Sequence, residues 1–178
     1  MIIIGLSGKK RSGKNTVAKL IATETPSLCK EFAFADALKD EVAKACGVKR
    51  SFLEENKQNF RLILQGWGTD FRRDLNDKQY WVKKLDSSLY EQFQKNPDCI
   101  ALITDVRFVD EAEYLRKCGA VIVRVNRPTT SVDEHSSETD LDSYKFDFVI
   151  DNSSTLNNLA ADVRRLLHNL KIPTKNKV

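Results

Sequence analysis

The stretch MIIIGLSGKKRSGKNT, residues 1–16, decides the fold. Its β-branched apolar run is followed by Gly8, four further residues, Gly13 and Lys14, which is the G-x-x-x-x-G-K spacing of a phosphate-binding loop. The run predicts a strand before the loop, and the apolar period from Val17 onward predicts a helix after it. Glycines let backbone N–H groups turn inward around a polyphosphate, and a helix N-terminus adds orphan N–H groups and a positive dipole end. We therefore expect this loop to bind nucleotide phosphates, with Lys14 as a cation for the β and γ phosphates.

The residue after Lys14 departs from the usual loop pattern. A Ser or Thr hydroxyl normally binds Mg²⁺ there, whereas this chain has Asn15, with Thr16 one place later. An amide oxygen can also serve a hard cation, directly or through water. A plain glycine turn is the alternative to a phosphate site, but the basic residues gathered in the loop favour phosphate binding.

Length and composition are those of an ordinary globular domain. The 178 residues suit one domain, and no apolar run approaches the roughly 20 residues that span a bilayer. The start of the chain lacks the basic region of a signal peptide. Four scattered cysteines without a C-x-x-C pair indicate a reduced cytosolic protein and disfavour a zinc site. The net charge of +4 fits anionic small molecules and gives no strong argument for nucleic acid.

Strands alternate with helices along the rest of the chain. Short apolar runs predict the strands, and segments with a 3.6-residue apolar period predict the helices between them. The expected strands cover residues 2–4, 28–34, 99–104, 120–125 and 146–150. We expect Gly66 and Gly68 to interrupt a helix around Trp67. The alternation predicts an α/β fold with a parallel sheet covered by helices on both faces.

Residues able to do chemistry fall at or just after the ends of the expected strands. They are Gly8, Asp36, Asp105, Arg127 and Asn152. Ligands of such sheets bind beyond the carboxyl ends of the strands. Asp105 closes an apolar strand where a Walker-B acid would hold magnesium, with a helix cap as the alternative role. Arg107 projects from the same edge, where the planar fork of an arginine suits phosphate.

Two further segments are candidates for binding. Residues 65–74 (QGWGTDFRRD) mix glycines, an aromatic and paired arginines, which fits either a kinked helix with a solvated basic face or an acceptor site for a phosphate and a base. Trp67 taken alone is more typical of a core residue than of a base platform. The polar segment 127–145 is typical of a loop or lid, and His135 within it is more typical of an exposed residue or local cap than of a catalytic base.

Together these pieces resemble the deoxynucleoside monophosphate kinases of tailed bacteriophages. The resemblance rests on GLSGKKRSGKNTVA (5–18), FADALK (34–39), LQGWGTDFRRDL (64–75) with YWV (80–82), ITDVRFVDEAEYLR (103–116), HSSETDLD (135–142) and FDFVIDNSSTLNNL (146–159). It implies the three-layer fold of P-loop nucleoside monophosphate kinases, with a five-stranded parallel sheet, helices on both faces and a short lid. One domain would span residues 1–178, with the acceptor-binding region at residues 36–80 and the lid at residues 127–145.

The resemblance also implies a reaction and its residues. The reaction is ATP-dependent transfer of the γ-phosphoryl group to a deoxynucleoside 5′-monophosphate, with Mg²⁺ as cofactor. The residues that would bind ATP are Gly8, Lys9, Arg11, Ser12, Gly13, Lys14, Asn15, Thr16, Asn152 and Ser153. The residues that would frame the acceptor are Asp36, Lys39, Gln65, Trp67, Thr69, Arg72, Arg73, His135, Ser137 and Glu138. The catalytic residues would be Lys14, Asp105, Arg107 and Arg127, and the metal ligands would come from Asn15, Thr16 and Asp105.

Other functions stay open at this point. Phosphomevalonate kinases and dephospho-coenzyme A kinases share the general plan, and a nucleotide-binding module without catalysis is a different class. The chain carries no N-K-x-D guanine motif, which disfavours a GTPase switch, and its mild charge disfavours a nucleic-acid ATPase. We expect ATP and a deoxynucleoside monophosphate as partners, with no nucleic acid and no membrane, in the cytoplasm of the expressing cell (a host cell for a phage gene). A homodimer is left open.

Overall fold

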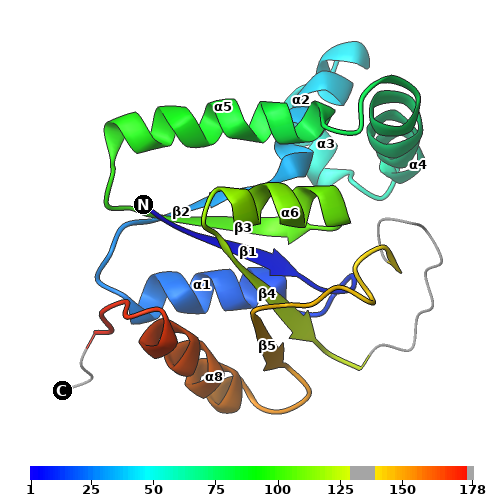
Figure 1. The fold of residues 1–178 in the computed structure, drawn as a ribbon. Helices are drawn as coiled ribbons and strands as arrows, with labels where there is room; N and C mark the ends of the chain where they lie inside the picture. The colour runs from blue at the N-terminus through cyan, green and yellow to red at the C-terminus, as the bar shows by residue number, and fades with distance from the viewer. Residues whose placement is uncertain (129–138, 176–178) are drawn as a thin grey trace.

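The computed structural model describes residues 1–128 and 139–175 of the chain. Their centre is a sheet of five parallel strands in the order β2-β3-β1-β4-β5 (Figure 1). The strands are β1 (Ile2–Ser7), β2 (Cys29–Phe32), β3 (Ile100–Val106), β4 (Val121–Asn126) and β5 (Phe148–Asp151). The predicted five-stranded parallel sheet is confirmed, and each strand overlaps its expected range.

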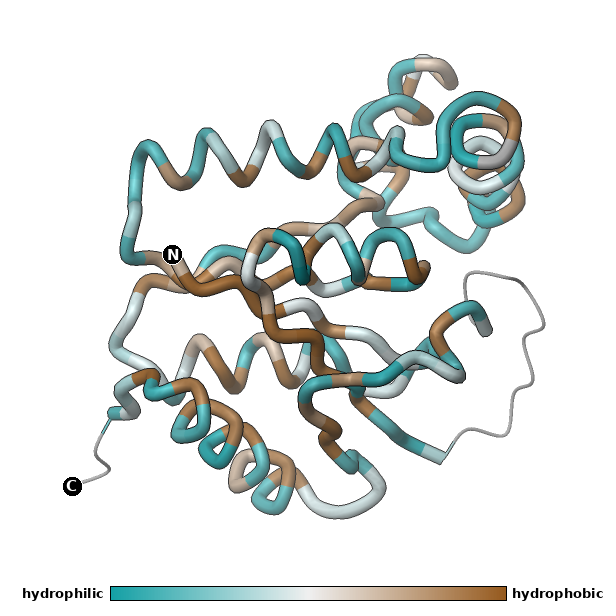
Figure 2. The backbone as a smooth tube through the Cα atoms, in the orientation of Figure 1, coloured by the Kyte–Doolittle hydropathy of each residue, from teal (hydrophilic) through white to brown (hydrophobic). Residues whose placement is uncertain are grey.

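The central strands are apolar on both faces because helices cover both faces of the sheet. In β3, Ala101 and Ile103 pack into one core layer, whereas Ile100 and Leu102 pack into the other, as the alternation of side chains along a strand requires. Figure 2 shows the same division, with hydrophobic strands between helices whose hydropathy alternates along their length. Both faces of the sheet are thus used for packing, so polar side chains are left to gather at the carboxyl ends of the strands.

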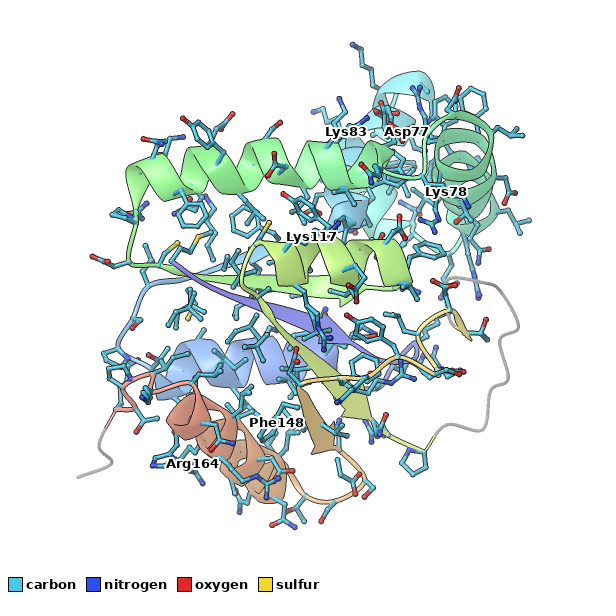
Figure 3. The ribbon with its side chains drawn as sticks, in the orientation of Figure 1. Asp77, Lys78, Lys83, Lys117, Phe148 and Arg164 are labelled. Atoms are coloured by element: carbon cyan, nitrogen blue, oxygen red, sulfur yellow. The ribbon has the colours of Figure 1, made fainter. Side chains whose placement is uncertain are left out.

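Helices form one layer on each side of the sheet. One layer holds α1 (Lys14–Glu24) and α8 (Leu156–Asn169), and the other holds α5 (Tyr80–Lys95) and α6 (Val109–Lys117) (Figure 1). Figure 3 shows the side chains that fill the space between these layers and the sheet. The three-layer arrangement is the one predicted. Among the helices that the structure describes, none has an apolar stretch long enough to cross a membrane.

Four helical segments gather at one end of the molecule, beside the carboxyl ends of the strands (Figure 1). They are α2 (Phe34–Ala45), α3 (Arg50–Glu55), α4 (Arg61–Gln65) and the π-helix η1 (Gly66–Asn76). Val42, Ala43 and Leu53 form a small separate core here, against which Phe60 and Trp67 pack. This region therefore has its own small core and lies beside the carboxyl edge of the sheet.

The prediction that Gly66 and Gly68 interrupt a helix is confirmed only in part: α4 ends at Gln65, but the chain does not leave helical winding there. From Arg61 to Asn76 the chain stays helical, and its winding widens from α to π at Gly66. At the end of η1 the N–H of Asp77 donates to the carbonyl of Arg72 at 3.0 Å, a spacing of five residues. Such windings are rare and occur frequently at functional sites. Side chains on η1 therefore do not follow the face that α-helical spacing predicts.

Candidate active site

The phosphate-binding loop occupies residues 8–13, between β1 and α1. Gly13 adopts a φ of 102°, and a Cβ there would lie 2.2 Å from Asn152 Nδ2, so that only glycine fits. Asn152 Nδ2 in turn donates to the carbonyl of Ser12 at 2.8 Å. Asn152, for which the family resemblance implies an ATP contact, therefore ties the end of β5 to the loop.

Lys14 folds back over this loop. Its ammonium donates to the carbonyl oxygens of Gly8 (2.6 Å) and Lys9 (3.0 Å). Beneath it, the hydroxyl of Ser12 is fully buried and is one of two buried side-chain polar atoms, among the described residues, without a hydrogen-bond partner. A buried hydroxyl without a partner is a reason to expect a ligand that can accept its hydrogen bond, such as a phosphate.

A cleft of about 500 Å³ opens beside the loop, between α1, α2, η1 and the end of β3. It is lined by eight of the predicted site residues, namely Arg11, Lys14, Asn15, Lys39, Gln65, Thr69, Asp105 and Arg107. These residues come from both ends of the predicted site, the phosphate loop and the acceptor region. The structure thus brings the two halves of the predicted site into one cavity.

The charge of this cleft is strongly positive. Its basic lining residues are Lys10, Arg11, Lys14, Lys39, Lys57, Arg61 and Arg107, whereas its acidic ones are Asp105 and Glu111. Burial and the nearby charge of Lys39 lower the pKa of Lys57, as expected where cations crowd together. Cations held at close quarters in a concave site attract anions such as phosphates.

Asp105 joins the sheet edge to the start of α2. Its two carboxylate oxygens accept the N–H groups of Phe34 (2.8 Å) and Ala35 (2.9 Å). Burial raises the pKa of Asp105, against the opposing effect of these hydrogen bonds and of Arg107. Asp105 does cap a helix, as the alternative prediction had it. The capped helix is α2, whose first residue, Phe34, lies 71 residues before Asp105 in the chain. Each oxygen keeps a lone pair, so a cation can still be bound.

Glu111, Arg61, Lys57 and Trp81 line the cleft although the sequence reasoning did not single them out. The carboxylate of Glu111 accepts the N–H groups of Arg107 (2.8 Å) and Phe108 (3.1 Å), and burial raises its pKa to about 8. A signal existed for it, because Glu111 stands four residues before Leu115 and so shares the buried face of its helix. A charged residue on an apolar helix face is a reason to suspect a site.

A second cavity, of about 580 Å³, lies at the carboxyl ends of β4 and β5. Three predicted residues line it, Lys9, Arg127 and Ser153, together with Arg124. The carboxylate of Asp142 binds the cations of both Lys9 (2.7 Å) and Arg124 (3.0 Å). This cavity lies against the phosphate loop on the side away from the acceptor region.

Several predicted acceptor residues line neither cavity. Asp36 accepts the N–H of Ala33 at 3.1 Å and pairs with Arg50, and Arg73 pairs with both carboxylate oxygens of Asp110 at 2.9 Å. Trp67 and Arg72 both donate to Glu41. His135, Ser137 and Glu138 lie outside the described residues. An acceptor role for all of these residues stays a prediction.

The donor set of the cleft fits a hard cation. Within the described residues, no group of three or more His, Cys, Asp or Glu side chains is arranged so that it could hold a metal ion by itself. Mg²⁺ does not need one, because it keeps waters and binds one or two protein oxygens together with substrate phosphates. Asp105 and Asn15 offer a carboxylate and an amide oxygen in the same cleft, and Thr16 is exposed on the first turn of α1.

Comparisons with known proteins agree with this geometry. A family model described as deoxynucleotide monophosphate kinase matches residues 41–163. A protein of Acanthamoeba polyphaga mimivirus named as a deoxynucleotide monophosphate kinase is 32% identical, over 88% of this chain and 91% of that protein. The deoxynucleotide monophosphate kinase of Escherichia phage RB69 is 33% identical over 61% of this chain, which spans 45% of that protein. A sugar kinase structure from a Janibacter species superposes with a TM-score of 0.56 at 16% identity, covering 97% of this chain and 95% of that one, and so supports the fold alone.

Proposed function

The chain belongs to the deoxynucleotide monophosphate kinase family, and we propose that its cleft of about 500 Å³ is where the γ-phosphoryl group of ATP passes to a deoxynucleoside 5′-monophosphate, giving ADP and the diphosphate. The observation that carries the proposal is the union of a phosphate-binding loop with seven basic side chains in one cleft. The family match favours a deoxynucleotide acceptor over phosphomevalonate or dephospho-coenzyme A, and over a module without catalysis.

No general base is needed for this reaction. The attacking atom is a phosphate oxygen of the acceptor, which is already ionised near neutral pH because its second pKa is about 6. The obstacle is the repulsion between two anions brought to contact distance. Basic side chains that are already fixed in place lower that barrier, since their orientation costs nothing at the moment of transfer.

Lys14 and Arg107 are the side chains best placed to do this. Lys14 is held by two loop carbonyls at the mouth of the cleft, from which its ammonium can reach the β and γ phosphates. Arg107 lines the same cleft two residues beyond Asp105, where it would stabilise charge on the transferring group. Lys39, Gln65 and Thr69 line the opposite wall and would contact the acceptor.

The donor nucleotide would extend from the loop into the cavity of about 580 Å³ at β4 and β5. Ser153 and Arg127 line that cavity, in line with the ATP and catalytic roles predicted for them. Residues 127–145 would act as a lid over a single domain spanning residues 1–178, with the acceptor region at residues 36–80. Exclusion of water by such a segment would limit wasteful hydrolysis of ATP.

Mg²⁺ would be held by Asp105 and by the oxygens of Asn15 or Thr16, together with the ATP phosphates. When bound, the ion supplies charge neutralisation at the β and γ phosphates. The contribution of the chain itself is to keep the carboxylate of Asp105 in place through two backbone N–H groups.

The direct test is release of ADP from ATP and each deoxynucleoside and ribonucleoside monophosphate in turn. We expect turnover with one or more deoxynucleotides above the rate of ATP hydrolysis without acceptor. Phosphomevalonate and dephospho-coenzyme A serve as comparison acceptors. Turnover restricted to either of those, or the absence of acceptor-dependent ADP, would overturn the proposal.

A further inference from the structure

The carboxylate of Glu41 links three helical segments next to the cleft without lining it. Glu41 belongs to α2 and accepts hydrogen bonds from Trp67 Nε1 (3.2 Å), Arg72 Nε (3.0 Å) and the hydroxyl of Tyr80. Two of these donors lie on η1 and one on α5. The side chain of Glu41 is only 21% exposed, so that each of these donors would be left poorly solvated without it.

The hydrogen bonds and the charge around Glu41 stabilise its ionised form. Burial alone would raise the pKa of Glu41, but the hydrogen bonds from Tyr80 and Trp67 and the charge of Arg72 outweigh it and lower the pKa below its usual value. The guanidinium of Arg72 lies over the rings of Tyr80 (4.9 Å), Phe71 (5.4 Å) and Trp67 (5.9 Å). The ionised carboxylate is therefore the charge partner of a cation surrounded by aromatic rings.

Two residues of η1, Gly68 and Thr69, form one wall of the cleft. Glu41 is hydrogen-bonded to residues that precede and follow them in the chain. Gly68 and Thr69 line the cleft, while Trp67 comes just before them and Arg72 three residues after Thr69. The wall touches α2 closely, since a Cβ on Gly68 would lie 2.6 Å from a methyl of Leu38. A glycine at this position thus allows η1 to approach α2 closely.

The wall is also bonded to α5. Trp81 Nε1 donates to the carbonyl of Gly68 at 2.8 Å, and Trp81 itself lines the cleft. The turn from η1 into α5 is closed by Asp77, whose carboxylate pairs with Lys83 at 2.8 Å (Figure 3). π-helices occur mostly as single turns, whereas η1 runs for 11 residues. A change to α-winding would alter the number of residues per turn and so rotate Gly68 and Thr69 relative to α2.

We propose that Glu41 is a positioning residue for the acceptor: it fixes the winding of η1 through Trp67 and Arg72 and so places the Gly68–Thr69 wall. The inference rests on the proposed function, because it assigns this wall to the deoxynucleoside monophosphate. Glu41 itself touches no substrate. Its loss should weaken acceptor binding and leave ATP binding at the other end of the site unchanged.

The experiment compares steady-state constants of Glu41→Ala, Glu41→Gln and a control, Asp40→Ala. Asp40 is the neighbouring carboxylate on α2, is 66% exposed and pairs with Arg50 rather than with η1. Glu41→Ala should raise KM for the acceptor by about tenfold or more, while KM for ATP stays within about twofold of wild type. Glu41→Gln keeps one acceptor oxygen and should raise the acceptor KM by a smaller, measurable factor. Asp40→Ala should leave both constants at wild-type values.

A second readout does not depend on turnover. The chain has two tryptophans, Trp67 and Trp81, and both belong to this wall or its contacts, so we expect their fluorescence to change when the acceptor binds. The Kd of the acceptor should be highest in Glu41→Ala, lower in Glu41→Gln and unchanged in Asp40→Ala.

If Glu41→Ala does not fold, Glu41→Gln carries the test. Equal increases in KM for ATP and acceptor, or unchanged acceptor constants in a folded variant, would overturn the positioning role. A wild-type protein without acceptor-dependent ADP release would instead overturn the proposed function.

Discussion

The carboxylate of Asp105 accepts the backbone N–H of Phe34 at 2.8 Å, across 71 residues of sequence. Phe34 is the first residue of α2, and Asp105 stands at the end of β3 beside the phosphate-binding loop. Helix α2, at the start of the proposed acceptor region, is therefore attached to the sheet by the same side chain that is the best candidate for a metal ligand. Under the proposed function, placement of the acceptor and binding of the cation would share one residue.

Asp105→Asn separates these two roles only in part and should impair both. An amide offers one acceptor oxygen, so either Phe34 or Ala35 would face an N–H donor instead of a carboxylate oxygen. We expect a loss of about 1–3 kcal/mol in the free energy of unfolding, because a donor is left unsatisfied in a buried place. We also expect a higher Mg²⁺ concentration at half-maximal rate. Denaturant unfolding and a Mg²⁺ titration of the rate measure the two effects. A variant with unchanged stability would contradict the role of Asp105 in attaching α2.

Lys14→Ala should lower kcat by about a hundredfold or more, since it removes a few kcal/mol of stabilisation from the developing charge. The fold should persist, because the bonds of Lys14 to Gly8 and Lys9 lie within a loop that Asn152 also fixes. Lys19→Ala, an exposed lysine of the same helix, is the matched control and should keep the wild-type rate. Stopped-flow or coupled assays of ADP release decide the matter. Near-normal turnover in Lys14→Ala would remove Lys14 from its assigned role.

Much of this architecture follows from local patterns in the sequence. The spacing from Gly8 to Lys14 predicts a loop between a strand and a helix, because the glycines of such a loop adopt backbone angles that other residues avoid. Gly13 indeed adopts a φ that other residues rarely reach. The apolar run that ends at Asp105 predicts a buried parallel strand, because a strand covered on both faces is apolar at every position. Asp105 and Arg107 then reach the site because the carboxyl ends of parallel strands share one edge.

The acceptor region was harder to predict, and η1 shows why. In an α-helix, Gln65, Thr69, Arg72 and Arg73 would share one face, at spacings of four, seven and eight residues. Bonding over five residues widens the turn, so that Thr69 still faces the cleft while Arg72 turns toward Glu41. Under the positioning role proposed for Glu41, this winding is held by bonds to Glu41 and Trp81, which lie on other helices. No local spacing contains that information.

Arg107→Ala should slow phosphoryl transfer and leave the fold intact. The side chain lines the cleft, and the bond from the N–H of residue 107 to Glu111 belongs to the backbone and survives the substitution. We expect kcat to fall by about tenfold or more with KM for ATP nearly unchanged, because the interaction matters most when charge develops on the transferring group. Single-turnover measurements separate this step from product release. A change confined to KM for ATP would make Arg107 a ground-state binder.

Glu111 should make the stability of the protein fall as the pH rises. Burial, with a smaller contribution from the charge of Asp105, raises the pKa of Glu111 from 4.5 to about 8 in the folded protein. Between these values the folded state holds a proton that the unfolded chain has released, so the free energy of unfolding decreases with increasing pH across that window. Glu111→Gln keeps the shape of the neutral acid and removes this dependence. Denaturant unfolding at several pH values from 5 to 8 should therefore show the variant gaining stability relative to wild type as the pH rises.

Glu91→Gln, on an exposed position of α5, is the control. Its free energy of unfolding should change with pH in parallel with that of wild type over the same range. Parallel curves for Glu111→Gln and wild type would mean that the carboxyl is already ionised in the folded protein.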